Sequence, residues 1–139
     1  EKYQLITLWH VLEHVPNLNQ TLNIIHTLLD EKGVLLIAVP NHLSYDAKIY
    51  KAHWAGYDVP RHLWHFNQQS MERILQNNHF KLQQILPMKL DAYYVSLLSE
   101  AYKGTGILRY IKAFVNGFVS NLTAKSNKQY SSLIYIFKK

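Results

Sequence analysis

The sequence lacks cysteine, long hydrophobic runs and any surplus of acidic charge. The absence of cysteine from its 139 residues excludes disulfides, thiolate zinc sites and cysteine nucleophiles, and is compatible with a reducing cytoplasm. No apolar run approaches the roughly 20 residues of a membrane span, so we expect no stable membrane insertion. The first residues, EKYQ, do not resemble the basic and then apolar start of a signal peptide. We therefore expect a cytoplasmic protein.

Acidic residues number 9 against 15 lysines and arginines, which gives a net charge of +6. A surplus of this size favours phosphates and acidic surfaces. The basic residues are scattered, however, and no block of five or six resembles a nucleic-acid-binding arm. We expect an ordinary solvated surface and no nucleic-acid partner. Hydrophobic residues make up 48% of the chain, enough for the core of a single domain of this length.

Strand and helix patterns alternate in the first part of the chain. Residues 5–9 (LITLW) are a short apolar run, as expected of a strand that is buried on both faces. Residues 18–29 carry leucine and isoleucine at helical spacing, and a plausible capping residue, Asn17 or Asn19, lies at their start. This pattern predicts a strand followed by a helix.

The predicted helix is expected to end at Gly33. Residues 34–39 (VLLIAV) then form a second apolar run, which Pro40 ends. A strand, a helix and a strand within about 35 residues make a βαβ unit, whose strands are parallel and whose crossover is right-handed. The sequence therefore predicts an α/β fold.

The stretch from 41 to 66 is polar and aromatic and has no regular period. Segments of this length inside a compact domain are usually lids or binding loops, so we interpret it as a functional loop. Beyond it, the patterns predict a helix capped by Asn67, a strand, two helices and a last strand. The last four elements are expected over residues 80–86, 92–102, 107–122 and 131–137.

The helix predicted over 107–122 carries its large apolar side chains on one face. We expect this face to pack in the core or to form a lid, and a helix that lies on a membrane surface is the alternative. The positions on this face are Ile107, Ile111, Phe114, Val115, Phe118, Val119 and Leu122.

Polar side chains follow both strands of the βαβ unit. His10, Glu13 and His14 come directly after the first strand, and Asn41 follows the second. Because ligands of open parallel sheets bind beyond the carboxyl ends of the strands, these four residues are expected on one binding rim. The long loop leaves from the same rim, which makes it a natural lid.

Residues 10–14 (HVLEH) also match the short pattern of inverted zinc proteases. That chemistry needs two histidines one turn apart in a sustained helix. Here a strand runs directly into His10, and Pro16 follows His14 after a single residue. We therefore expect no metal site, and a zinc hydrolase is the weakest of the alternatives.

A second cluster of functional side chains lies at 54–66 (WAGYDVPRHLWHF). Arg61 is suited to hold an anionic substrate group through two hydrogen bonds, while His62 and His65 can take up a proton near neutral pH. The structural alternative is that the aromatic residues fill the core and the histidines bond loop backbone.

Several segments follow one another in the order found in one known family. They are residues 5–16 (LITLWHVLEHVP), 28–33 (LLDEKG) and 34–41 (VLLIAVPN). Together they resemble the second half of a class I S-adenosylmethionine-dependent methyltransferase. The stretch at 54–66 is similar to a bacterial branch associated with cell-envelope and polysaccharide genes, and more distantly to quinone-biosynthesis O-methyltransferases. The resemblance covers residues 1–88 well and the last strand moderately.

The resemblance implies a Rossmann-like sheet of seven strands in the order 3-2-1-4-5-7-6, of which this chain would contain strands 4, 5, 6 and 7 with their flanking helices. It divides the chain into a βαβ core with a substrate loop, a helical lid or insertion, and the last strand, over residues 1–91, 92–130 and 131–139.

The same resemblance assigns roles to individual residues. The methionine side of the cofactor, S-adenosylmethionine, would be lined by Trp9, His10, Val11 and Leu12. The catalytic candidates are Glu13, His14 and His62, of which one would act as base where the acceptor arrives protonated. The substrate pocket would be bordered by Asn41, Trp54, Tyr57, Arg61 and His65.

The implied activity is methyl transfer to a small-molecule acceptor, with O-methylation slightly ahead of N- or C-methylation. The alternative from a different class is a non-catalytic domain that keeps the same fold and binds a partner through its apolar helices.

Two features of the resembling family are missing. No Gly-x-Gly-x-Gly occurs in the chain, and no acidic residue ends a strand where the ribose of the cofactor would bind. We therefore expect a fragment of a longer protein that carries half a cofactor site and binds the cofactor weakly or not at all. The first strand would leave an open apolar edge, through which two copies could pair.

Overall fold

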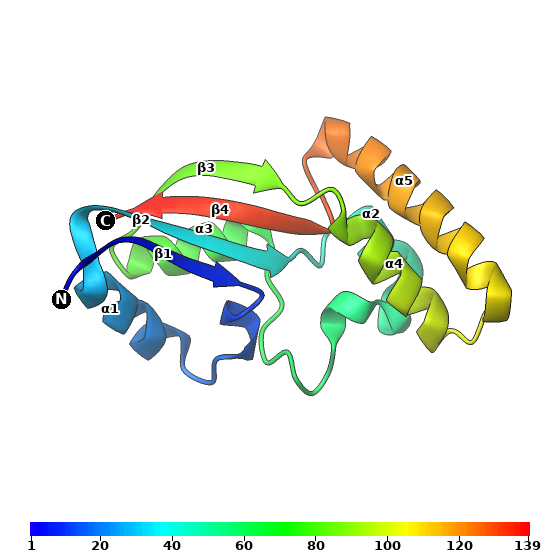
Figure 1. Ribbon diagram of the computed structural model, residues 1–139, viewed down its shortest axis with the longest axis horizontal. Helices are drawn as coiled ribbons and strands as arrows, with labels where there is room; N and C mark the ends of the chain where they lie inside the picture. Colours follow the sequence, from blue (N-terminus) through cyan, green and yellow to red (C-terminus); the bar gives the residue numbers. More distant parts are fainter.

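Four strands form one mixed sheet in the order β1-β2-β4-β3 (Figure 1). The computed structural model describes residues 1–139. The strands are β1 (Tyr3–Trp9), β2 (Leu29–Pro40), β3 (Lys81–Pro87) and β4 (Ser132–Lys138). β1 runs parallel to β2, whereas β4 is antiparallel to both of its neighbours. The predicted parallel βαβ unit is confirmed, and the strand order is that expected for strands 4, 5, 7 and 6.

Five α-helices accompany the sheet. They are α1 (Leu18–Leu28), α2 (Tyr45–Tyr50), α3 (Gln68–Asn77), α4 (Asp91–Tyr102) and α5 (Arg109–Asn127). Single 3-10 turns also occur as η1 (Leu12–His14), η2 (Lys51–His53), η3 (Ala55–Tyr57) and η4 (Gly106–Leu108). In Figure 1, α4 and α5 form a hairpin beyond the end of the sheet, far from the amino terminus. None of the helices is both long and apolar enough to cross a membrane.

The core lies between one face of the sheet and the helices α1 and α3. Alternate residues of β2 and β4 point into it, because successive side chains of a strand face opposite sides of a sheet. The helices contribute Leu22 of α1 and Met71 and Leu75 of α3, all completely buried. The sheet contributes Leu35, Ile37, Val39, Leu133, Tyr135 and Phe137.

Two helix starts follow from local hydrogen bonds that the sequence predicts. The side chain of Asn17 accepts a hydrogen bond from the backbone N–H of Gln20, which caps α1. Asn67 and Ser70 cap α3 reciprocally, each side chain accepting from the other residue's backbone N–H. Such caps satisfy backbone donors that the first helical turn leaves free.

The end of α1 lies earlier than expected. The helix ends at Leu28, and β2 begins at Leu29, so Gly33 lies within the strand rather than at the helix end. Leu29 is fully buried in the core and pairs with Tyr3 of β1, while Val34 pairs with Leu5. Residues 30–32, which the sequence pattern assigned to the helix, therefore belong to β2.

The strand β1 is an edge strand, and the expectation that it is buried on both faces is wrong. It pairs with β2 alone, and Leu5 and Trp9 are each more than half exposed. The open apolar edge expected from the sequence is therefore present. Pairing of two copies through this edge stays a prediction.

The long stretch from 41 to 66 contains more regular structure than the aperiodic pattern indicates. Ser44 caps the six-residue helix α2 by accepting a hydrogen bond from the N–H of Ala47. The buried carboxylate of Asp46 then accepts hydrogen bonds from Trp54, Ser120 and Ser131. A helix of six residues is too short to show a hydrophobic period, which is why the sequence did not predict it. Its buried carboxylate is stabilised by these three partners from other parts of the chain.

The helix α5 does not bury the face that its apolar period indicates. Its buried residues are small, namely Ala113, Gly117, Ser120 and Ala124. Ser120 donates to Asp46 of α2, whereas Gly117 faces Tyr93 of α4. A Cβ atom on Gly117 would lie only 2.6 Å from Cδ1 of Tyr93, so the two helices approach more closely than larger residues allow. The large apolar side chains of α5 are exposed instead, which corrects the expectation of a core face.

Candidate active site at the carboxyl end of the parallel strands

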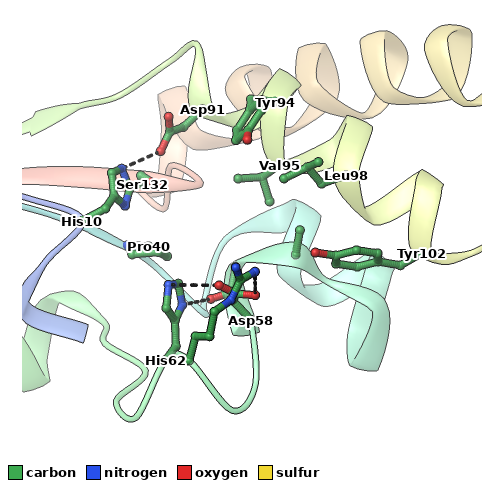
Figure 2. A pocket seen from close by; sticks show the side chains of 13 residues that line it. His10, Pro40, Asp58, His62, Asp91, Tyr94, Val95, Leu98, Tyr102 and Ser132 are labelled. Carbon is green, nitrogen blue, oxygen red and sulfur yellow. Dashed lines mark hydrogen bonds and ion pairs between the residues drawn. The ribbon is translucent and has the colours of Figure 1, made fainter. Parts of the chain in front are cut away.

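A pocket of about 280 Å³ opens where β1 and β2 end (Figure 2). One wall comes from the turn η3 and the loop after it, and the opposite wall comes from α4. The lining residues are His10, Pro40, Ala55, Gly56, Asp58, Arg61, His62, Asp91, Tyr94, Val95, Leu98, Tyr102 and Ser132. The pocket therefore lies on the rim that the strand order predicts.

His10 lies at the point where the chain leaves β1. Its backbone has a positive φ of 52°, and its N–H still donates to the carbonyl of Ala38 in β2. This turn directs the imidazole between two carboxylates: Nε2 is 3.2 Å from Oδ2 of Asp91, and Nδ1 is 3.3 Å from Oε1 of Glu13. The hydrogen bonds to Asp91 and then to Glu13 raise the pKa of His10 to about 9. The residue is therefore a cation at neutral pH.

Asp91 stands in the first turn of α4 and completes this ion pair (Figure 2). Burial raises its pKa, but the hydrogen bond from His10 and further polar contacts outweigh burial, so the pKa is lowered. Sequence reasoning missed this residue. An acidic residue at the start of a predicted helix is typical of a favourable helix-dipole position. That local explanation gives no reason to expect its contact with His10 as well.

Glu13, His14 and His62 converge beside the pocket. Glu13 is almost completely buried, and its Oε2 has no hydrogen-bond partner within the protein. Nε2 of His62 lies 3.9 Å from Oε1 of Glu13 and 3.9 Å from Oδ2 of Asp58. The rings of His14 and His62 meet edge to face, with centroids 4.6 Å apart. The three residues predicted as catalytic are thus brought together from two segments almost 50 residues apart.

Backbone carbonyls determine which ring nitrogen of each histidine is free. Nδ1 of His62 is 2.9 Å from the carbonyl of Gly56, and Nδ1 of His14 is 2.9 Å from the carbonyl of Arg61. Because a carbonyl only accepts hydrogen bonds, each Nδ1 carries the proton. In the neutral form of either histidine, Nε2 is then unprotonated and able to accept a proton.

The loop from 58 to 66 is held across the ends of the strands by backbone hydrogen bonds. The carbonyl of Glu13 accepts from the N–H groups of Leu63 and Trp64, and the N–H of His42 donates to Phe66. Trp64 also donates from Nε1 to the carbonyl of Val15. These contacts place His62 over Glu13 without help from neighbouring charges.

Arg61 lies at the mouth of the pocket. Its guanidinium pairs with the carboxylate of Asp58, and its side chain is largely exposed. Since a guanidinium has five donors and Asp58 engages only part of them, Arg61 keeps donors for a second anionic group at the pocket entrance.

The same three convergent residues also offer ligands for a metal. One atom each from Glu13, His14 and His62 lies within 4.8 Å of the others, and imidazole with carboxylate is a common ligand set for transition metals. The HVLEH pattern itself is not supported, because His10 precedes the three-residue turn η1 rather than sharing a helix with His14.

Four predicted substrate residues do not line this pocket. Asn41 is buried and donates from Nδ2 to Gln129 and to the carbonyl of Tyr130. Trp54 is buried and donates to Asp46. The rings of Tyr57 and His65 meet edge to face, 5.0 Å apart. Their assignment to substrate stays a prediction, as does that of Arg61, which does line the pocket.

The predicted cofactor residues separate into three environments. Trp9 and Val11 are exposed beside the end of β1, Leu12 is completely buried in the core, and His10 lines the pocket. Leu12 is therefore inaccessible in this structure, and its assignment to the cofactor stays a prediction.

The wall contributed by α4 was not predicted from the sequence. Tyr94, Leu98 and Tyr102 line the pocket together with Val95. Their spacing of three to four residues places them on one face of the helix. The signal was visible as an apolar and aromatic stripe over 94–102, but such a stripe is typical of ordinary core packing as well.

Comparison with known proteins identifies the fold. A family model described as a methyltransferase domain matches residues 1–85, which is more than half of the 139 residues. The chain belongs to the methyltransferase domain family. The resemblance found in the sequence is thereby confirmed. No curated protein sequence matches the chain.

Solved structures show the same fold as this methyltransferase domain at low identity. Phosphoethanolamine N-methyltransferase 2 of Haemonchus contortus, in complex with S-adenosyl-L-methionine, is 15% identical with a TM-score of 0.52. A SAM-dependent methyltransferase of Archaeoglobus fulgidus is 15% identical with a TM-score of 0.54. A chain of the Haloferax volcanii complex between the Trm112 methyltransferase activator and a putative methyltransferase is 8% identical with a TM-score of 0.61.

These matches cover 99% of this methyltransferase domain in each case, but only 33%, 60% and 54% of the respective solved chains. The chain thus spans between one third and three fifths of the structures that it resembles. The expected Rossmann-like α/β fold, represented by a part of the full sheet, is confirmed.

Proposed function

We propose that this chain supplies the catalytic rim and the acceptor pocket of an S-adenosylmethionine-dependent methyltransferase that acts on a small molecule. The observation that carries the proposal is the convergence of Glu13, His14 and His62 at the end of β1, beside a pocket of about 280 Å³. That volume approaches the lower limit of ordinary small-molecule sites. Family membership and the likeness to solved methyltransferases support this reading.

His62 is the proposed general base. Its Nδ1 proton is engaged by the carbonyl of Gly56, so Nε2 is the nitrogen that can accept the proton of an acceptor hydroxyl. The buried carboxylate of Glu13 lies within 3.9 Å of Nε2 and stabilises the imidazolium that forms. His14 packs on the edge of this ring and is proposed to hold its orientation. This chemistry favours O-methylation over N- or C-methylation.

Arg61 and the helix α4 are proposed to select the acceptor. The guanidinium of Arg61 lies at the pocket entrance and suits an anionic group. Tyr94, Leu98 and Tyr102 provide an apolar and aromatic wall for a flat ring. We therefore propose a hydroxylated, anionic aromatic acceptor, with the region 92–130 as the lid over a core of 1–91 and the last strand 131–139 behind it.

S-adenosylmethionine, once bound, supplies a methyl group on a positively charged sulfur. The residues proposed to hold its methionine side are Trp9, His10, Val11 and Leu12. The rim fits such a cation in one respect: the unpartnered Oε2 of Glu13 is a buried carboxylate oxygen at the same strand end. We also propose that the 139 residues alone bind the cofactor weakly, because they contain no Gly-x-Gly-x-Gly.

Calorimetric titration of the chain with S-adenosylhomocysteine tests the weak-binding proposal. We expect no saturable heat at micromolar concentrations of the chain. Saturable micromolar binding would overturn this proposal, while it would strengthen the assignment of the cofactor.

Transfer of a radiolabelled methyl group from S-adenosylmethionine tests the catalytic proposal. The test uses a protein that joins this chain to a glycine-rich cofactor-binding half, because we expect the 139 residues alone to be inactive. We expect O-methylated product from hydroxylated aromatic acids. His62→Gln is expected to lower the rate by about 100-fold, while the matched change at the exposed, distant His79, His79→Gln, leaves it unchanged. No product with any hydroxylated or amino acceptor would contradict the proposal and favour a non-catalytic domain.

A further inference from the structure

The outer face of α5 is an unusually large exposed apolar surface. Ile111 and Phe114 are 66% and 65% exposed, and Ile107, just before the helix, is 84% exposed. Phe118 and Leu122 continue the same stripe at helical spacing and are each about half exposed. We call the surface made by Ile107, Ile111, Phe114, Phe118 and Leu122 the outer face. Surfaces of this kind mark interaction sites in folded proteins.

The packing of the hairpin explains why this face has no partner within the chain. The small residues Ala113, Gly117 and Ala124 lie on the opposite side of α5 and are buried, where Tyr93 of α4 contacts the helix at Gly117. The side of α5 that packs against the rest of the chain is therefore the side with the small residues, and the outer face stays exposed. In Figure 1, α5 lies on the outside of the hairpin, and its buried side contacts α4 and, through Ser120 and Asp46, α2.

Charge around the outer face has one sign. All nine acidic residues of the chain lie within the first 100 positions, whereas residues 101–128 contain no acidic residue. The same segment contains five basic residues, Lys103, Arg109, Lys112, Lys125 and Lys128. They stand at both ends of α5 and in the turn before it. An apolar stripe between basic residues is complementary to the anionic headgroups and acyl chains of a membrane surface.

We propose that the outer face of α5 docks on anionic lipid membranes, with the helix lying in the plane of the interface. The apolar stripe would enter the boundary between headgroups and acyl chains, and the basic residues would contact lipid phosphates. The helix lies on the bilayer without crossing it, in agreement with the absence of a spanning helix. This interface goes beyond the proposed methyl transfer and is measured without any methyl donor or acceptor.

A second copy of the chain fits the outer face less well than a lipid surface. Pairing two outer faces would bring together two copies of the segment 101–128, each with five basic and no acidic residues. Like charges across an interface oppose association, whereas the negative potential of an anionic leaflet attracts each of them. The charge pattern therefore favours lipid.

Co-sedimentation of the chain with vesicles tests the proposal. Vesicles of phosphatidylcholine alone are compared with vesicles that contain about one third phosphatidylglycerol. We expect binding to the anionic vesicles, much weaker binding to the neutral ones, and loss of binding as salt concentration rises. Phe114→Gln/Phe118→Gln is expected to weaken binding about tenfold or more, since two aromatic side chains would no longer be buried in the interface.

Matched controls distinguish binding through the outer face from nonspecific hydrophobic adsorption and from the effects of misfolding. Ile24→Gln changes a half-exposed apolar residue of α1 and is expected to bind vesicles as the unchanged chain does. Lys112→Gln should weaken binding more than Arg73→Gln on α3. Circular dichroism establishes that each variant is folded.

Three results would overturn the proposal. They are no binding to anionic vesicles, equal binding of the Phe114→Gln/Phe118→Gln variant, and a dimer of the unchanged chain in sedimentation analysis that the same variant converts to monomer. The last result would assign the outer face to a second copy.

Discussion

The helices α1 and α5 both carry an apolar face that their sequences indicate, yet they use it in opposite ways. In α1, Leu18, Leu22 and Ile25 lie in the core beneath the sheet. In α5, the large apolar residues are exposed, and the buried positions are alanine, glycine and serine. The two helices therefore differ in what they pack against rather than in their amphipathic pattern.

The comparison teaches that an apolar period identifies a face but not its partner. A helix that covers a pleated sheet needs large side chains to fill the space, since the interior is densely packed. A helix that packs closely on another helix needs small side chains at the contact, as at Gly117 against Tyr93. For α5 the close contact decided the orientation, and the larger apolar residues stayed exposed.

The largest expected effect comes from removing a core residue of α1. Leu22 is completely buried, so Leu22→Ala should lower the free energy of unfolding by about 2–5 kcal/mol, because it removes buried methyl groups and leaves a cavity. Phe118→Ala on the exposed face of α5 should change it by less than about 0.5 kcal/mol. Denaturant unfolding of the chain measures both. A large loss for Phe118→Ala would mean that the outer face is covered in solution.

The next effect comes from widening the contact between α4 and α5. In Gly117→Val, the new Cβ would lie 2.6 Å from Cδ1 and 2.9 Å from Cα of Tyr93. We expect a loss of about 1–3 kcal/mol from this overpacking. Lys112→Val, at an exposed position of the same helix, is the control. It should lower the free energy of unfolding only slightly, because valine has a lower helix propensity than lysine. Equal effects of both changes would show that the close approach of the helices is unimportant for stability.

The pH dependence of stability tests how the hairpin is held to the sheet. The pKa of His10 is raised to about 9 by Asp91 and then Glu13, so its protonated form stabilises the folded state. That contribution is complete below pH 6.5, the unfolded pKa, and is lost as the pH rises through about 9. After allowance for solvent exposure, it amounts to about 1–2 kcal/mol.

Unfolding measured from pH 6 to 10 should show this loss in the unchanged chain and not in His10→Gln. Asp91 does not titrate in this range, because its pKa lies below its ordinary value. Stability that rises between pH 6.5 and 9, or that falls equally in the variant, would contradict the ion pair between the end of β1 and the start of α4.

The smallest expected effect concerns the helix starts. Asn17 caps α1 through its side chain, whereas Leu108, at the corresponding position of α5, makes no side-chain cap. Asn17→Ala should cost about 1 kcal/mol, and Leu108→Ala should be nearly neutral. Thermal unfolding of the two variants checks this difference, and an equal loss would show that capping does not distinguish the helices.

Much of the candidate site could be predicted from the sequence because its residues follow strand ends. His10, Glu13 and His14 stand directly after an apolar run, and the carboxyl ends of parallel strands form a shared rim. His62 could be identified only as a member of a polar cluster, because the local sequence does not indicate that its loop lies next to Glu13. That contact depends on the backbone hydrogen bonds of Leu63 and Trp64.

Asp91 and the wall of α4 could not be assigned to the pocket from the sequence. Asp91 lies more than 75 positions beyond Glu13, and its local context is that of an ordinary helix start. Asn41 and Trp54 show the converse. Their residue types suggest binding, but their polar atoms are used by Tyr130 and Asp46 inside the fold. Hydrogen-bond partners of buried polar groups are a tertiary property.

The sequence by itself determined the order of the elements, the parallel βαβ unit, the helix caps and the residues that follow the strand ends, because these depend on local periodicity and on short-range hydrogen bonds. Only the tertiary structure decided that Leu5 and Trp9 of β1 are exposed, that Asp91 contacts His10 and that α5 turns its large apolar residues outward. Those outcomes depend on which surfaces fit one another in space, and a close fit between small residues can exclude a larger apolar face from the core.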